Sequence, residues 1–410
     1  MKKNHSQFLS CLIISLLLVM VWSCESNEEK ATTAVKEAKL ENPKDTPKKP
    51  KDTANKKGGK SVAKKKEYDV LPLDKVNLPK GFKIEVYADK IKRARSLAIS
   101  KEGTLYVGTM AKKGEVTAVK NGKKYTLSSG WQMPNGVALK NGDLYVAEVS
   151  KIHKFKDIEN NLENPKSEVI YDKYPTETHH GWKFIAFGPD EKLYVPVGAP
   201  CNICKSEDEV YASITRMNDD GSNMEVVQHG IRNTVGFTWH PDSKDLWFTD
   251  NGRDWWGDDI PGCELNHAPK DGMHFGYPYC HQGDLAENDE EIEKRKCSEF
   301  TPPAKVLKAH VAPLGVEFIP SGNFPKKYEK QILVAEHGSW NRTKKQGYRL
   351  ALLTLDGNKV VKDETFADGW LDSSDDSVWG RPVDMEFMAD GSLLVSDDMA
   401  DVVYRIFYDK

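Results

Sequence analysis

One pattern recurs six times between residues 96 and 395. Each copy has a short strand of alternating apolar residues, a polar turn that usually contains Gly or Asp, and a second β-rich strand. The copies span residues 96–107, 136–146, 184–195, 236–248, 315–334 and 384–395. Such strand–turn–strand units, repeated at intervals of about 40 to 80 residues, are typical of β-propellers. The sequence therefore predicts an all-β fold, a six-bladed propeller of four-stranded antiparallel blades.

Two further strands predict how the ring closes. Residues 81–87 form a strand before the first repeat, and residues 402–408 form one after the last. Pairing these strands in one blade would remove the open sheet edges that invite aggregation. The alternative fold is a pair of β-sandwiches, which six copies disfavour. The longest insertion is expected at residues 255–310, on a rim where sites usually form.

The N-terminal region has a different character. Lysines follow Met1, and residues 8–22 form an apolar run of about 15 residues, shorter than the roughly 20 residues of a membrane span. We therefore predict a lipoprotein signal peptide at residues 1–23. The run ends in Val-Trp-Ser-Cys, which resembles a lipobox and predicts that Cys24 is lipidated. The protein is then exported and anchored to the bacterial cell envelope. An ordinary cleaved signal with an incidental cysteine is the alternative.

Residues 24–67 are predicted to form a disordered Lys-rich linker, because they contain no aromatic residue to bury. The charge changes at the end of this linker: residues 1–67 carry +7, and residues 68–410, the predicted propeller domain, carry about −10. An acidic folded domain is a poor partner for phosphate backbones, so we expect no nucleic-acid partner.

Seven cysteines occur in the chain, and five of them lie in the propeller region. Export permits disulfides, and Cys280 with Cys297 is the preferred pair. Cys201 and Cys204 form a Cys-x-x-Cys motif that is compatible with a tight disulfide, a redox pair or half of a metal site. Lys205 follows this motif, which excludes a c-type haem attachment site.

Polar groups gather where the inner strands of the repeats should begin. Arg95, His180, Arg232, Asn251 and Arg381 are far apart in sequence, but a propeller brings these strand starts together around its axis. We therefore expect them to line one funnel, where three arginines indicate an anionic ligand. Each position has a plainer explanation when taken alone, such as a surface histidine or an arginine that binds turn carbonyls.

Residues 250–259 are dense in Asp, Asn and Gly and close the fourth repeat. Calcium takes hard oxygen ligands from carboxylates and backbone carbonyls, so this segment is a candidate calcium loop. It does not have the spacing of an EF-hand. A solvated acidic turn is the alternative.

Several motifs in order resemble the glucose/sorbosone dehydrogenase family, whose members are six-bladed propellers dependent on pyrroloquinoline quinone (PQQ). The branch that this chain resembles most is the sorbosone dehydrogenase-like branch. The resemblance runs over most of residues 70–408 and rests on His180 before residues 188–190, and on residues 230–233, 249–255, 264–266, 275–278, 337–342 and 380–384.

The resemblance implies roles for these residues. His180 would be the general base that takes a proton from the sugar hydroxyl, and Arg232 would stabilise charge on the quinone oxygen. Gly252 and Arg253, through their backbone carbonyls, and Asp254 would hold Ca²⁺. The residues implied to contact PQQ are Arg95, Asn233, Asn251, His337, Trp340, Arg342 and Arg381.

Two positions depart from the pattern of glucose dehydrogenases. Ala199 stands where those enzymes carry an Asp that supports the catalytic histidine, and Val383 stands where they carry a second Arg. These departures leave open which group orients His180, with Glu177 and His179 as candidates.

The expected activity is therefore the oxidation of a sugar or sugar aldehyde, with PQQ and Ca²⁺ as cofactors and an external electron acceptor. A calcium-dependent sugar lactonase, which would bind its metal through side chains from several blades, is one alternative. A propeller that binds carbohydrate or a partner without catalysis is the other.

Overall fold

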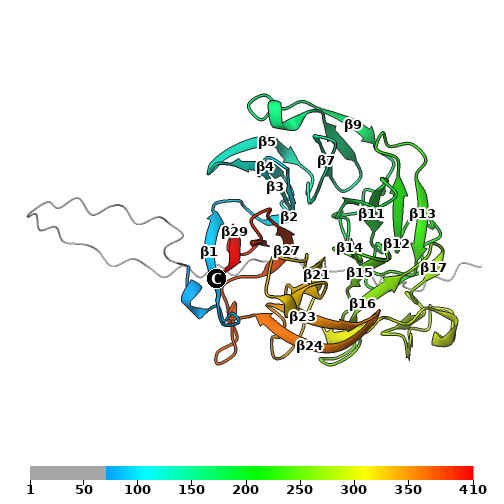
Figure 1. Cartoon of the computed structure of the whole chain (residues 1–410). Helices are drawn as coiled ribbons and strands as arrows, with labels where there is room; N and C mark the ends of the chain where they lie inside the picture. Colours follow the sequence, from blue (N-terminus) through cyan, green and yellow to red (C-terminus); the bar gives the residue numbers. More distant parts are fainter. Residues whose placement is uncertain (1–70, 410) are drawn as a thin grey trace, which may run out of the picture. The chain divides into compact units, whose positions relative to one another are not determined.

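The computed structural model describes residues 71–409 and shows sheets arranged as blades around a central axis (Figure 1). The predicted signal peptide, Cys24 and the predicted linker lie outside the described residues. Helical structure between residues 71 and 409 is limited to short 3₁₀ turns, none of which could cross a bilayer. These turns are η2 (Leu73–Lys75), η3 (Ile158–Asn160), η4 (Cys297–Glu299) and η5 (Lys326–Tyr328).

The first three blades follow the chain from residue 94 to residue 229, with the inner strand first in each. Blade 1 contains β2 (Ala94–Ile99), β3 (Leu105–Thr109), β4 (Gly114–Lys120) and β5 (Lys123–Trp131). Blade 2 contains β6 (Gly136–Lys140), β7 (Asp143–Ala147), β8 (Ile152–Phe155) and β9 (Ser167–Tyr171). Blade 3 contains β10 (Ala186–Phe187), β11 (Leu193–Val197), β12 (Ser213–Met217) and β13 (Glu225–His229). A fifth short strand, β17 (Met273–His274), pairs parallel to β13 and departs from the predicted antiparallel pattern.

The remaining blades complete the ring. Blade 4 contains β14 (Phe237–Trp239), β15 (Leu246–Asp250), β16 (Gly262–Ala268) and β20 (Lys305–Ala309). Blade 5 contains β21 (Pro313–Phe318), β22 (Ile332–Glu336), β23 (Arg349–Asp356) and β24 (Lys359–Ala367). Blade 6 contains β27 (Pro382–Phe387), β28 (Leu393–Asp397), β29 (Val402–Tyr408) and β1 (Phe82–Ala88).

The ring closes as the sequence predicts. Strand β1 pairs antiparallel with β29, with Phe82 opposite Tyr408 and Glu85 opposite Arg405. The outermost strand of blade 6 therefore comes from the start of the domain, and the six-bladed all-β prediction is confirmed.

The insertion predicted at residues 255–310 is shorter than expected, because β16 lies inside that range. The residues between β16 and β20 carry β17, the hairpin of β18 (Cys280–His281) and β19 (Leu285–Ala286), and η4. A second hairpin, β25 (Leu371–Asp372) with β26 (Ser377–Val378), precedes blade 6.

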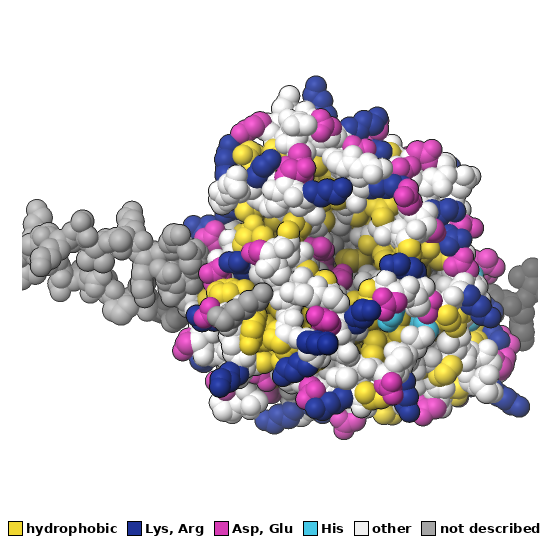
Figure 2. Space-filling model, viewed as in Figure 1, with side chains coloured by type: hydrophobic (Ala, Val, Ile, Leu, Met, Phe, Trp, Pro, Cys, Tyr) yellow, Lys and Arg dark blue, Asp and Glu magenta, His cyan; other side chains and the backbone are white. Residues whose placement is uncertain are grey.

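The core lies between neighbouring blades. Trp247 of blade 4 packs with Val316 and Val334 of blade 5, and all three are buried. Phe82 of blade 6 packs on Phe366 of blade 5, edge to face at 5.2 Å between ring centroids. Burial of such side chains against the next blade stabilises the ring and fixes the position of each inner strand. Figure 2 shows charged side chains of both signs interspersed over the visible face of the described domain.

Candidate active site

A cavity of about 240 Å³ lies where residues at the starts of the inner strands meet. The structure brings together at this cavity most of the residues predicted from the sequence. Those that line it are Arg95, His180, Arg232, Asn233, Asn251, Gly252, Asp254, His337, Trp340 and Arg381. The expected convergence of Arg95, His180, Arg232, Asn251 and Arg381 on one funnel is therefore present.

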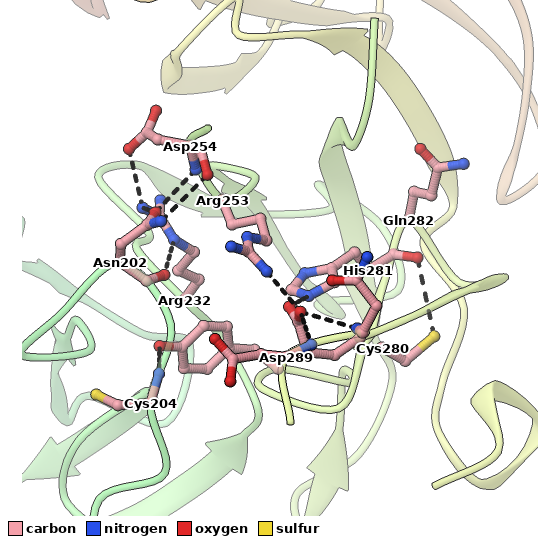
Figure 3. A network of polar contacts seen from close by, with 12 residues as sticks. Asn202, Cys204, Arg232, Arg253, Asp254, Cys280, His281, Gln282 and Asp289 are labelled. Atoms are coloured by element: carbon pink, nitrogen blue, oxygen red, sulfur yellow. Dashed lines mark hydrogen bonds and ion pairs between the residues drawn. The ribbon is translucent and has the colours of Figure 1, made fainter. Parts of the chain in front are cut away.

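Two predicted residues point elsewhere. The guanidinium of Arg342 donates to the carbonyl of Asp258 and, at 2.9 Å, to Oδ1 of Asp259. This position corrects the prediction that Arg342 contacts a cofactor, because its side chain binds the neighbouring loop instead. The side chain of Arg253 pairs with the buried carboxylate of Glu287 (Figure 3) and lies over the ring of Trp256, so only its backbone remains available for the predicted metal site.

His180 enters the cavity from the segment before blade 3, and its side chain is buried. Its backbone φ is +49°, a left-handed conformation that is uncommon for a non-glycine residue and is often found at functional sites. Its Nδ1 lies 2.9 Å from the carbonyl oxygen of Ala199. A carbonyl oxygen only accepts, so Nδ1 carries the proton and the Nε2 lone pair is free.

Neither residue proposed to orient His180 does so through a hydrogen bond. The carboxylate of Glu177 accepts from the hydroxyl of Tyr211. The ring of His179 lies 4.1 Å from that of His180, tilted by 53°. The backbone of Ala199 performs the task, so the prediction that Glu177 or His179 orients His180 is wrong.

The protonation state of His180 also suits a base. Burial, the positive charge of Arg232 and the neighbouring His179 together lower the pKa of His180 well below 6.5. The imidazole is therefore neutral at neutral pH and can accept a proton.

Arg232 is held rigidly at the edge of the cavity (Figure 3). Its Nε donates to the carbonyl of Asn202 at 2.9 Å, and its Nη2 donates to Oδ1 of the same residue at 2.8 Å. Nη2 also pairs with Asp254 at 3.2 Å, and Nη1 donates to the carbonyl of Asn251 at 3.1 Å. The guanidinium charge therefore has a fixed position before any ligand binds.

Asp250 holds the backbone of the same segment. Its carboxylate accepts from the N–H groups of Arg232 and Asn233, at 2.8 and 2.6 Å. Burial raises the pKa of Asp250 to about 6. It is opposite Glu264 in the β15–β16 ladder, and burial beside Asp250 raises the pKa of Glu264 to about 8.

The opposite wall carries Arg95 and Arg381. Arg381 donates to the carbonyls of His337 and Gly338, at 3.0 and 2.7 Å. Arg95 is 3% exposed, yet its Nε and Nη1 have no hydrogen-bond partner, and its ion pair with Asp398 is 3.6 Å long. Buried donors without partners are costly and point to a ligand that supplies acceptors.

His337 completes this wall. Its Nε2 lies 2.8 Å from Oδ1 of Asp398, and burial lowers its pKa to about 4. The ring is therefore neutral at neutral pH and donates its Nε2 proton to the carboxylate.

The cysteine predictions have clear outcomes. Cys280 and Cys297 form the predicted disulfide. Cys201 and Cys204 form a second one, which decides among the alternatives for that motif, and Cys263 is free and buried. Between residues 71 and 409, no group of three or more His, Cys, Asp or Glu side chains is placed to hold a metal.

Sequence reasoning missed the residues that hold the site. Asn202, Asp250, Asp398 and Asn341 position the predicted residues without having been assigned roles. Only Asn202 carried a usable signal, since it lies inside the Cys-x-x-Cys motif and a closed loop often presents a side chain.

Residues 76–408 match the sequence model of the family described as TrAA12-like. The chain belongs to this TrAA12-like family. An uncharacterized protein of Borreliella burgdorferi is 33% identical over 352 residues, which cover 82% of this chain and 91% of that protein. The match confirms the predicted family resemblance, while the sorbosone dehydrogenase-like branch stays a prediction.

Solved structures share the fold of this TrAA12-like chain. A calcium structure of the Trichoderma reesei carbohydrate-active enzyme of family AA12 has a TM-score of 0.70 and 19% identity, over 81% of this chain and 97% of that one. The holo form of the pyranose dehydrogenase PQQ domain from Coprinopsis cinerea has a TM-score of 0.67 and 16% identity over the same shares. At these identities the likeness is one of fold.

Proposed function

We propose that this chain oxidises a sugar or sugar aldehyde, with PQQ as the redox cofactor and Ca²⁺ as its partner. The observation that carries the proposal is the pairing of two features in one cavity. A neutral, oriented His180 offers a free Nε2, and a buried Arg95 offers donors without partners.

The residues present fit a planar cofactor with several carboxylates. Arg95 supplies unpaired donors, and Arg381 adds a second cation on the same wall, only partly satisfied by carbonyls. Guanidinium groups bind carboxylates with two parallel hydrogen bonds, which suits such a ligand. Asn233 and Asn251 add amide groups at the same cavity.

Gly252 and Asp254 line the cavity and offer a backbone carbonyl and a carboxylate, and the adjacent Arg253 carbonyl would join them. These are hard oxygen ligands of the kind that Ca²⁺ prefers. The Asp254 carboxylate already binds Arg232 and Asn341, so the two carbonyls are the main candidates.

Bound PQQ would supply a quinone that accepts a hydride from the sugar. His180 would take the proton of the sugar hydroxyl at Nε2 while Ala199 keeps the ring in place. Arg232 would stabilise negative charge that develops beside it, because its guanidinium is already fixed by Asn202. Trp340 would offer an aromatic face at the same cavity.

The test is an assay of dye reduction. The propeller domain, residues 68–410, is purified without metal, mixed with PQQ and Ca²⁺, and offered a panel of aldoses and sugar aldehydes. We expect dye reduction that depends on PQQ and is lost in His180→Ala. Hydrolysis of sugar lactones without PQQ would favour the lactonase alternative, and absence of PQQ binding would refute the oxidoreductase.

The cellular setting is part of the proposal. We infer that Cys24 is acylated and tethers the domain to the cell envelope, so that electrons pass to an external acceptor and no nucleic acid is bound. Metabolic labelling with a radioactive fatty acid tests this tether. Label in the wild type that disappears in Cys24→Ala is expected, and an unlabelled wild type would refute it.

A further inference from the structure

Two tryptophans stand in solvent beside the mouth of the cavity. Trp255 is 71% exposed and Trp340 is 62% exposed. Their ring centroids are 5.2 Å apart, and the ring planes meet at 86°. Trp340 lines the cavity directly, so the pair forms a right-angled aromatic corner that is continuous with it. We call this pair the tryptophan corner.

The tryptophan corner brings no advantage to folding. Large aromatic side chains gain stability by burial, and these two remain largely in water. Trp255 also has a φ of +66°, which is strained for a bulky residue and occurs mainly where function requires it. An exposed and strained tryptophan therefore indicates a binding surface.

Hydrogen bonds hold the two loops in register. Asn341, the neighbour of Trp340, donates to Oδ1 of Asp254 at 2.9 Å, just before Trp255. The backbone N–H of Asp254 donates to Oδ1 of Asn202 at 2.8 Å. The corner thus rests on the same residues that hold Arg232.

A second set of contacts braces the far side of the loop. Arg342 donates to Asp258 and Asp259, and the N–H of Thr343 donates to Oδ1 of Asp258 at 3.0 Å. His310 donates from Nε2 to the carbonyl of Gly257 at 2.7 Å. This bracing explains why Arg342 does not reach the cavity, and it means that the corner is formed before a ligand arrives.

We propose that the tryptophan corner is a subsite for a second sugar ring. The apolar C–H face of a pyranose packs on an aromatic face, while its hydroxyl groups point to water or to charged neighbours such as the exposed Asp259 carboxylate. The substrate class is then an oligosaccharide or glycoside, whose terminal ring enters the cavity while the next ring rests on the corner. The assignment of the terminal ring to the cavity rests on the proposed function.

The test measures sugar binding by the cofactor-free protein, so it does not depend on catalysis. A glycan array of mono- to hexasaccharides identifies the best binder, and calorimetry then compares wild type, Trp255→Ala, Trp340→Ala and the double variant. Val361→Ala is the matched control, because Val361 is 53% exposed on the outer strand β24.

We expect the double variant to bind the best oligosaccharide about tenfold more weakly, the control to bind as wild type, and Trp255→Phe to regain part of the loss. Binding of monosaccharides alone, binding of no sugar, or oligosaccharide binding that ignores both substitutions would overturn the subsite. Oligosaccharide binding that needs the corner, in a protein that reduces no dye, would support the subsite and refute only the dehydrogenase.

Discussion

Nδ1 of His180 lies 2.9 Å from the carbonyl oxygen of Ala199, and this single contact sets the tautomer of the proposed base. Ala199 stands where related dehydrogenases are expected to carry a supporting Asp. The chain therefore keeps an acceptor at this place but takes it from the backbone. Since every residue has a carbonyl, the substitution by Ala does not remove the means of orienting His180.

The approach of Gly198 to His180 predicts a sensitive position. A Cβ at residue 198 would lie 2.6 Å from Cβ of His180, and no real pair of such atoms is that close. We expect Gly198→Ala to displace the imidazole and lower kcat/KM about 100-fold, measured by dye reduction. Gly122→Ala, in an open turn, is the control and should leave kcat/KM unchanged. Equal activity of both variants would contradict the role of this contact.

The pH dependence should report the depressed pKa of His180. Burial and Arg232 lower this pKa well below 6.5, so the neutral form persists as the pH falls through 6.5. Activity that needs the neutral ring is lost only below the folded-state pKa, so the acidic limb of kcat/KM should lie below pH 6.5. Steady-state kinetics between pH 4 and 8 measure it, and a limb at or above pH 6.5 would speak against His180 as the base.

Arg95 should control cofactor affinity. Its Nε and Nη1 lack partners, and lysine cannot reproduce the planar fork of donors. We expect Arg95→Lys to weaken PQQ binding by about tenfold to 100-fold, as measured by absorbance titration of the metal-loaded protein. Arg93→Lys, at an exposed position two residues away, should bind PQQ as the wild type does. If both variants bind alike, Arg95 does not meet the cofactor.

Asn202 should act through Arg232. It accepts two hydrogen bonds from that guanidinium through its carbonyl and Oδ1. In Asn202→Ala only the carbonyl contact remains, and we expect kcat/KM to fall about tenfold while the melting temperature changes little. Asn202→Asp keeps the Oδ acceptor and should recover most of the activity. A loss of activity in Asn202→Asp as large as in Asn202→Ala would mean that the acceptor is not what matters.

The fold was largely predictable from the sequence, because each blade repeats the same alternation and the closing strands flank the repeats. The convergence of Arg95, His180, Arg232, Asn251 and Arg381 followed from that geometry. What the sequence did not reveal was the destination of long side chains and the use of backbone acceptors. Arg342 sits in the right motif but binds a loop, and residue type says nothing about the Ala199 carbonyl.

The most direct test of the account is a single-turnover measurement on protein loaded with PQQ and Ca²⁺. Sugar is added without an electron acceptor, and the absorbance of the bound cofactor is followed in wild type and His180→Ala. We predict rapid reduction in the wild type and a rate slower by at least about 100-fold in the variant, with equal cofactor content. No reduction in the wild type, or equal rates in both proteins, would contradict the account.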